Sequence, residues 1–297
     1  MQSAILIPIF ANEKTDTRKV IELIEAHVSV GPVHVVNQGK RIHFPSEETN
    51  EIFVQHHPAG LGTWGSLHFA YDLIVENQGL SPVEIADIVA VNLAFMYYPA
   101  DIVRELLEFT EKKSLDHVVG RRNDIAASLS TDPNQGYVRG ILECFFGSLA
   151  SVMLTSEADL FKDSFSGLHC FSKERYLASK WHWVHFTNWG GALQSQIQTH
   201  LDGFEKGYMR VGHDVKRDWS SVTYGDDPWE TIVAMMDKAR ELPIFAEATE
   251  ENLQKALADL HVSFSHQSWM DKSTEQKMRS YLDYYNQNTK KAPFLQF

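Results

Sequence analysis

Short apolar segments alternate with amphipathic segments through the first 120 residues, and this alternation constrains the fold more than any other feature of the chain. The apolar segments have the length of strands, and they are residues 4–10, 33–36, 51–55, 86–91 and 117–120. Between them, Val20, Ile21, Ile24 and Val28 repeat at helical spacing, with Thr15 or Thr17 as the expected cap, and residues 101–112 form a second helical pattern. Strand–helix alternation predicts an α/β fold with a mostly parallel sheet and helices on both faces.

The pattern is less regular after residue 120. We expect a helix over 137–154 that breaks near Gly147, a strand over 166–172, a helix over 189–204 and a strand over 208–215. Residues 228–288 read as helical, with a break at Pro243. The sequence thus predicts one α/β domain over residues 1–225 and a helical C-terminal extension over residues 226–297 that packs on it.

Composition excludes several classes of protein. The net charge of −12 over 297 residues disfavours nucleic acid as a partner, since nucleic-acid binding needs clustered Lys and Arg. No apolar run reaches the ~18 residues of a membrane span, and the apolar start at residues 4–10 fits a strand better than a signal peptide. With only Cys144 and Cys170, a reducing compartment, the cytoplasm, is expected.

Several short motifs occur in a characteristic order. They are Ile7-Pro8 followed by Asn12-Glu13, the glycine-rich turn 60–65, Pro99 before a helix, the Val-Val-Gly-Arg-Arg of residues 118–122, residues 163–173 with Ser166-Gly167, and Gly207-Tyr208 followed by Arg217. In this order the chain resembles, over roughly residues 3–225, the GT-A-fold family 2-type glycosyltransferases, similar to dolichyl-phosphate mannosyltransferases. The resemblance implies a GT-A-like fold that binds a nucleotide-sugar donor.

Two departures from the family pattern concern metal and nucleotide binding. The family's Asp-x-Asp, which holds a divalent cation, is replaced by Asn92-Leu93-Ala94, and its acidic pair after the second strand is replaced by Asn37-Gln38. Divalent Mg²⁺ and Mn²⁺ prefer carboxylate and other hard oxygen ligands. We therefore expect no metal site built from protein residues, and at most weak binding of Mg²⁺ or Mn²⁺ through the donor diphosphate.

The resemblance also implies which residues bind the nucleotide-sugar. They are Pro8, Asn12, Glu13, Asn37, Gly62, Asn92, Arg121, Arg122 and Arg217. Arginine suits a diphosphate because its guanidinium can donate two parallel hydrogen bonds. The residues alone leave other roles open, because Asn12 and Glu13 could cap and start a helix and the arginines could form surface ion pairs.

On the acceptor side, Asp163 is the candidate catalytic base, since a carboxylate can take the proton of an acceptor hydroxyl. Trp183 and Trp189 could form an aromatic platform for the acceptor sugar. Asp163 could equally be a turn residue, and the tryptophans could be packing residues of a loop. A metal site built from scattered histidines such as His169, His200 and His213 is a weaker hypothesis.

These observations favour an inverting glycosyltransferase that is soluble, acts on an unknown acceptor and depends weakly or not at all on metal. The missing carboxylates at positions 92 and 94 keep open a non-catalytic nucleotide-sugar-binding relative of the family. A sugar-phosphate nucleotidyltransferase is disfavoured, because the glycine-rich turn follows the third predicted strand rather than the first. The donor sugar, the acceptor and the oligomeric state are not indicated by the sequence.

Overall fold

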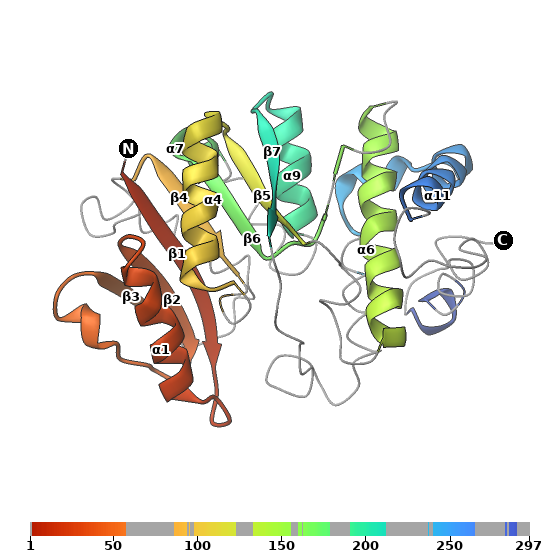
Figure 1. The fold of residues 1–297 in the computed structure, drawn as a ribbon. Coiled ribbons are helices and arrows are strands. Elements are labelled where there is room, and N and C mark those ends of the chain that lie inside the picture. Colours follow the sequence, from red (N-terminus) through yellow and green to blue (C-terminus); the bar gives the residue numbers. More distant parts are fainter. Residues whose placement is uncertain are drawn as a thin grey trace. The chain divides into compact units, whose positions relative to one another are not determined.

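The computed structural model describes residues 2–57, 86–93, 95, 98–122, 133–155, 160–161, 163–178, 191–211, 237, 240–264, 283 and 285–289. The chain forms two compact units (Figure 1). The first unit comprises residues 1–123 and 166–214, and the second comprises residues 124–165 and 215–297. The domain boundary expected at residue 225 stays a prediction.

Seven strands of the described chain form one sheet in the first unit. They are β1 (Ser3–Ala11), β2 (Val33–Gly39), β3 (Ile52–His57), β4 (Ile88–Asn92), β5 (His117–Arg122), β6 (Leu168–Ser172) and β7 (Lys206–Val211). Their order is β3-β2-β1-β4-β6-β5-β7, and every pair is parallel except the two that β6 makes. The predicted α/β fold with a mostly parallel sheet is confirmed.

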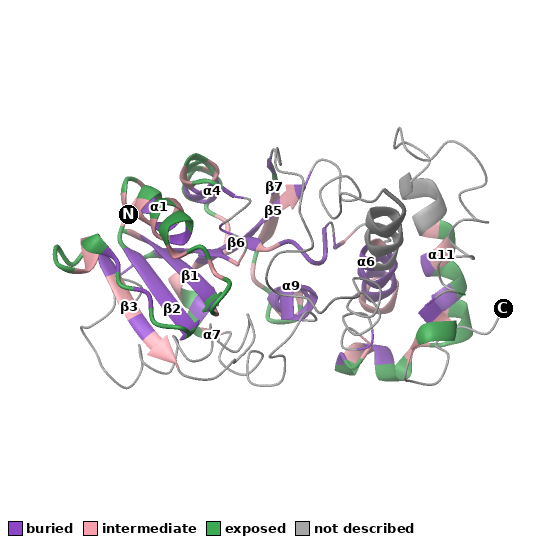
Figure 2. Cartoon of the chain, turned by 90° about the horizontal axis from the view of Figure 1, so that it is seen from below, coloured by how far each residue is buried: buried purple, intermediate pink, exposed green. Residues whose placement is uncertain are grey.

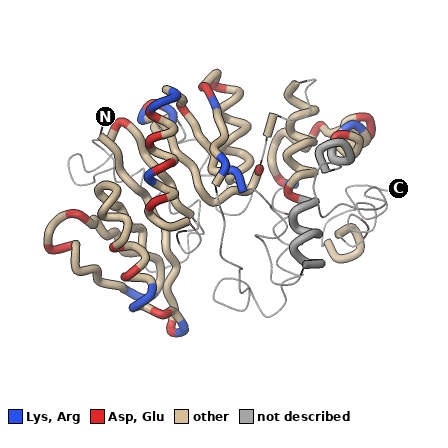
Figure 3. Tube along the Cα trace, in the orientation of Figure 1, with Lys and Arg blue, Asp and Glu red and all other residues tan. Residues whose placement is uncertain are grey.

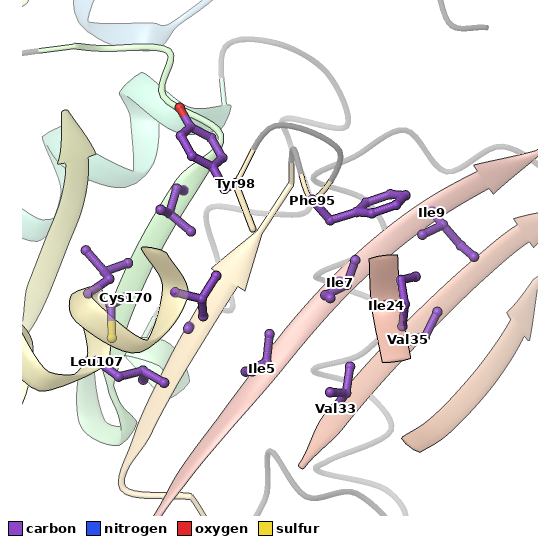
Figure 4. Close-up of a cluster of buried hydrophobic side chains, with 14 of the residues drawn as sticks. Ile5, Ile7, Ile9, Ile24, Val33, Val35, Phe95, Tyr98, Leu107 and Cys170 are labelled. Carbon is purple, nitrogen blue, oxygen red and sulfur yellow. The ribbon is translucent and has the colours of Figure 1, made fainter. Parts of the chain in front are cut away.

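One face of the sheet packs against helices α1 (Thr17–Val28) and α4 (Ala100–Lys113). Alternate residues of the strands point to this face, and Figure 4 shows Ile5, Ile7, Val33 and Val35 beside Ile24 of α1. The expected cap of α1 was wrong, because the side chain of Asp16 accepts the hydrogen bond from the Lys19 amide. Asp16 precedes the helix directly and therefore reaches the free amide of the third helical residue.

The opposite face carries α7 (Lys173–Ala178) and α9 (Gly191–Leu201). A second apolar cluster on this face joins residues of β1, β2, β4 and β6 to both helices, namely Ala4, Leu6, Val36, Ala86, Val89, Val91, Phe171, Tyr176 and Ala192. Figure 2 shows the buried strands and the buried helix α9. Helices on both faces are therefore confirmed, although the short α7 was not predicted.

The second unit contains α6 (Pro133–Leu154), a 3-10 turn η2 (Pro243–Glu247) and α11 (Glu250–Phe264). The break expected near Gly147 is wrong, since α6 runs through it. A β-carbon at Gly147 would lie 2.1 Å from Ser164 Oγ and 3.0 Å from the Phe161 carbonyl oxygen. Glycine stands there because Phe161 and Ser164 approach the helix closely, rather than because the helix ends.

Two further features bear on the ends of the elements. Strand β2 continues through Asn37 and Gln38 to Gly39, beyond its predicted end, because these residues pair with β1 and β3. Gly39 has φ of +80°, and a 3-10 turn, η1 (Pro45–Glu47), follows before β3.

Within the part of the chain that the structure describes, no helix has the length and apolar character to span a membrane.

Candidate functional site

The carboxyl ends of the parallel strands form the candidate site. The chain moves outward from β1 through β2 to β3 and then returns to place β4 on the other side of β1. Ligands of open α/β sheets bind at the carboxyl ends of the strands where the strand order reverses in this way. Pairing between β1 and β4 ends at Leu6 and Val91, whereas pairing between β1 and β2 runs on to Ala11 and Gly39.

Pro8 and Phe10 occupy the part of β1 that extends beyond its pairing with β4. Pro8 is buried and pairs in register with Val36 of β2. Phe10 is 46% exposed although it lies in a central strand. An exposed aromatic ring at this position can pack against a flat ligand such as a nucleotide base, and the sequence reading did not single it out.

Asn12 shapes the loop after β1. Its side-chain Oδ1 accepts from the Lys14 amide at 2.8 Å, and its own amide donates to Thr15 Oγ1 at 2.8 Å. Glu13 is exposed and lies 3.8 Å from Lys40, a weak surface ion pair. Asn12 therefore stabilises a turn before α1, which supports the structural alternative for this residue, and the Glu13 carboxylate faces solvent.

The side chain of Asn37 is occupied by its own loop. Its Oδ1 accepts from the Ile42 amide at 2.8 Å, and its Nδ2 donates to the Lys40 carbonyl at 3.1 Å. The residue is 1% exposed. Asn37 thus holds residues 37–42 in a compact turn beside the strand end, which gives the residue a structural role at this end of the sheet.

Asn92, at the end of β4, is fully buried and turned toward α1. Its Nδ2 donates to the Tyr98 carbonyl at 3.0 Å and lies 3.2 Å from His27 Nε2. His27 Nδ1 lies 2.8 Å from the Leu23 carbonyl, so Nδ1 carries the proton and Nε2 accepts from Asn92. Burial lowers the pKa of His27, which favours this neutral form.

This arrangement tests whether the β4 end fits a divalent cation. The amide of Asn92 binds protein groups in the interior, and Ala94, which has no ligating side chain, lies outside the described residues. Among the described residues, no three His, Cys, Asp or Glu side chains gather as a metal site would require. The donor set at this strand end does not fit a cation held by side chains.

Arg121 and Arg122 end β5, and Figure 3 shows how Lys and Arg, in blue, are distributed along the chain. Arg121 is partly exposed, whereas Arg122 is buried. Arg121 pairs in register with Arg210 of β7, which is exposed. Two neighbouring arginines on the same face of a sheet repel each other, and an anion between them would relieve that repulsion. Arg210 was missed because a single arginine in a strand carries no motif.

Ser166 and Gly167 complete the edge between β4 and β5. Ser166 Oγ donates to the Gly120 carbonyl at 2.6 Å, and the Leu93 amide donates to the Gly167 carbonyl at 2.7 Å. Ser166 is 1% exposed, and Gly167 is partly exposed. The Ser-Gly motif therefore links the ends of β4 and β5 at the candidate site.

Asp163 belongs to the second unit. It is 5% exposed and has φ of +53°, a left-handed conformation that Asp tolerates better than most residues. This conformation supports the turn alternative and leaves its role as a base a prediction. Four other predicted binding residues lie outside the described residues, namely Gly62, Arg217, Trp183 and Trp189.

Comparison with known proteins gives structural likenesses only. No protein-family model matches the chain, and no curated protein matches it. Glucosyl-3-phosphoglycerate synthase from Mycobacterium tuberculosis, in complex with Mn²⁺, uridine diphosphate and phosphoglyceric acid, is 13% identical, with 87% of this chain and 78% of that chain covered and a TM-score of 0.48.

Two further solved structures are similar over most of their length. A nucleotide-diphospho-sugar transferase, so described, from Desulfovibrio desulfuricans G20 is 12% identical, with 98% of this chain and 100% of that chain covered and a TM-score of 0.42. TarS 1–349 from S. aureus in complex with UDP-GlcNAc is 11% identical, with 97% and 82% covered and a TM-score of 0.41. The fold class of the present chain follows from its own strand order and direction.

Proposed function

We propose that this chain is a glycosyltransferase that binds a nucleotide-sugar at the carboxyl edge of its sheet. The observation that carries the proposal is the reversal of strand order between β1 and β4, with Arg121 at the end of nearby β5. The collinear motifs from Pro8 to Arg217 support the same activity. Transfer proceeds with inversion, as in the family that the sequence resembles, to an acceptor that remains to be found.

The roles of the residues follow from the chemistry of the departing diphosphate. Arg121 and Arg122 stabilise its negative charge, with Arg217 as a further donor and Gly62 in the turn beneath the sugar nucleotide. Pro8, Asn12, Glu13 and Asn37 shape the nucleotide side. Asp163 takes the proton of the acceptor hydroxyl, and Trp183 and Trp189 hold the acceptor.

We propose that protein side chains contribute little to metal binding. The side chain of Asn92 is fully buried and is oriented by the Tyr98 carbonyl and His27, so any Mg²⁺ or Mn²⁺ would be held chiefly by the donor diphosphate. We further propose the domain limits 1–225 and 226–297, and a reducing compartment such as the cytoplasm, which the free thiols of Cys144 and Cys170 suit.

A second function is favoured by specific contacts. Asn37 and Asn92 replace acidic residues of the family pattern, and both side chains bind the protein itself. A non-catalytic relative that binds the nucleotide-sugar without transferring the sugar would show the same contacts. The two functions share the binding site and differ only in turnover.

Calorimetry and turnover together separate these functions. A panel of nucleotide-sugars is offered with and without Mn²⁺ and with sugar, lipid-phosphate and small-acid acceptors. Binding with turnover that Mn²⁺ raises little supports the glycosyltransferase, and binding without turnover supports the non-catalytic relative. Failure of every nucleotide-sugar to bind would reject both.

Arg121→Met tests the proposed diphosphate contact. Loss of a charge-assisted hydrogen bond should weaken binding of a nucleoside diphosphate about 10- to 100-fold and leave binding of the nucleoside nearly unchanged. Arg104→Met is the matched control, because Arg104 is an exposed arginine of α4 whose guanidinium contacts Ser29 Oγ at 3.4 Å. Equal affinities for wild type and Arg121→Met would remove Arg121 from the site.

A further inference from the structure

A continuous chain of buried hydrogen bonds runs behind the candidate site. Arg175 Nε donates to Thr199 Oγ1 at 2.7 Å, and Thr199 Oγ1 lies 2.7 Å from His117 Nδ1. His117 Nε2 lies 3.0 Å from His169 Nδ1, and His169 Nε2 lies 2.9 Å from the Ser166 carbonyl oxygen. All five residues are at most 1% exposed.

When both histidines are neutral, the Ser166 carbonyl at the end of this chain determines which nitrogen of each ring carries the proton. A carbonyl only accepts, so His169 Nε2 carries a proton, and the Nδ1 of neutral His169 must accept from His117 Nε2. His117 Nδ1 then has no proton and must accept from the Thr199 hydroxyl. The hydrogen bonds therefore all point one way, from Arg175 to Ser166.

The Thr199 hydroxyl has a second possible acceptor besides His117 Nδ1. Its hydroxyl lies 2.8 Å from the Ser195 carbonyl as well as 2.7 Å from His117 Nδ1, but it has one hydrogen to donate. If the histidine pair gained a proton, His117 Nδ1 or His169 Nδ1 would become a donor and the order of the chain would fail. Burial, with the nearby charges of His169, Arg175 and Lys206, lowers the pKa of His117 well below its usual value, which favours the ordered neutral form.

The chain of hydrogen bonds ends at Ser166 and Gly167, whose own hydrogen bonds join the ends of β4 and β5. The Ser166 carbonyl accepts from His169, the Ser166 hydroxyl donates to the Gly120 carbonyl, and the Gly167 carbonyl accepts from the Leu93 amide. Groups from β5, from β6 and from the residue after β4 thus hold Ser166 and Gly167. A buried polar chain that is fully satisfied fixes geometry more firmly than apolar packing alone.

We propose that Thr199, His117 and His169 are positioning residues that orient the Ser166–Gly167 peptide at the carboxyl edge of the sheet. This inference rests on the proposed function, since it places the peptide beside the sugar and diphosphate of the donor. The three residues act through Ser166 and do not touch the donor. Their hydroxyl and imidazole groups connect α9 and β5 to one carbonyl that lies just before β6.

Nitrogen NMR of the histidine rings tests the chain without any substrate. With ¹⁵N-labelled histidine at pH 7, His117 and His169, assigned through His117→Gln and His169→Gln, should both be neutral and protonated on Nε2. A charged ring, or either ring protonated on Nδ1, would overturn the proposal. If a variant fails to fold, backbone and side-chain assignment of the wild-type protein identifies the two rings instead.

Thr199→Val and Thr199→Ser form a matched pair for the positioning role. Valine keeps the shape of threonine and removes the hydroxyl, so the Nδ1 resonance of His117 should move to that of a nitrogen that accepts no hydrogen bond, and the Gly167 amide resonance should shift. Serine keeps the hydroxyl and should leave both resonances in place. An unchanged Gly167 resonance in Thr199→Val would refute a positioning role.

Kinetics connect the chain to the reaction. Thr199→Val should lower kcat about tenfold, because small misplacements of a site cost large factors in rate, while the Kd of the nucleoside diphosphate stays constant. Thr199→Ser should restore kcat. An unchanged kcat in Thr199→Val would contradict the inference. Absence of nucleotide binding in the wild type would instead reject the proposed function and leave the NMR test standing.

Discussion

The two faces of the sheet differ in what they bury. The face under α1 and α4 is almost entirely hydrocarbon, with Ile5, Ile7 and Val118 at its centre. The face under α7 and α9 buries His34, His117, His169 and Arg175 among its apolar residues. Strand alternation sends neighbouring residues of one strand to opposite faces, so a single segment such as residues 117–119 serves both.

The two faces therefore have different roles: one stabilises the fold, and the other positions particular atoms. Apolar packing is non-directional and stabilises in proportion to the area buried, whereas a buried polar group is tolerated only when it forms directed hydrogen bonds. The apolar face therefore holds the fold together, and the polar face fixes particular atoms near the candidate site. Substitutions on the two faces should therefore have different consequences.

Ile24→Ala removes packing from the apolar face. Ile24 is fully buried between α1 and the sheet, and the cavity should lower the free energy of unfolding by about 2–5 kcal/mol, with little dependence on pH. Urea denaturation measures the change. Ile24→Val, which keeps the β-branch, should cost only about 0.5–1.5 kcal/mol. Equal losses of unfolding free energy in Ile24→Ala and Ile24→Val would mean that side-chain packing does not determine the stability of this face.

Asn92→Asp places a charge at the end of β4, where a buried polar side chain adjoins the apolar face. The carboxylate cannot donate to the Tyr98 carbonyl and would need a protonated His27, so we expect a loss of about 2–4 kcal/mol at pH 8. The new pair raises the pKa of folded His27, so stability should recover as the pH falls toward 6. Asn92→Ala is the uncharged control. Full stability together with strong stimulation of turnover by Mn²⁺ would contradict this account of position 92.

His34 makes the polar face sensitive to acid. Burial lowers its pKa to about 4 despite the hydrogen bond between its Nε2 and Gln55 Oε1 at 3.1 Å. The unfolded chain, with an ordinary pKa near 6.5, binds the proton first, so stability should fall by about 2–4 kcal/mol between pH 6.5 and 4. His34→Gln keeps a donor for Gln55 and should remove that part of the loss in urea denaturation. The same loss in His34→Gln and wild type would contradict the assignment.

Of these four substitutions, Lys206→Met should give the smallest change in the free energy of unfolding. Burial lowers the pKa of Lys206 to about 7, while its ammonium lies 5.3 Å from the centre of the Tyr208 ring. The unfolded chain holds the proton up to about pH 10, so wild-type stability should rise between pH 7 and 10. Methionine should add about 1–2 kcal/mol at pH 6 and remove the rise.

Lys255→Met is the control for that substitution. Lys255 lies on the exposed side of α11 and pairs with Glu251 at 2.9 Å, so its loss should change stability by at most about 0.5 kcal/mol. A rise in stability with pH that persists in Lys206→Met would show that Lys206 is not its source. Urea denaturation at pH 6 and 9 compares the two variants with wild type.

Much of the fold could be predicted because it depends on local pattern. Residues 4–10 form a continuous apolar run and residues 33–36 an apolar run interrupted only by His34, and such runs are typical of strands buried on both faces of a parallel sheet. The helix around Ile24 follows from apolar residues at helical spacing. The cap at Asp16 and the continuity of α6 through Gly147 were predicted wrongly, because each depends on which atoms come close in space.

The candidate site was predictable only as a set of strand ends. Asn12, Asn92 and Arg121 were found because they follow apolar runs and match a motif order. What each side chain contacts was not predictable, since Asn92 meets His27 from 65 residues away and His117 meets His169 from 52 residues away. Neither pair leaves a local signal in the sequence.

Residue type and spacing were enough to predict the α/β class, most of the described strands and the loss of carboxylates at positions 92 and 94. The inward turn of Asn92 to His27, and the buried chain that joins Thr199 to the histidines of two strands, became visible only in three dimensions. Hydrogen bonds depend on distance and direction between atoms, and only folding brings these distant residues within reach of one another.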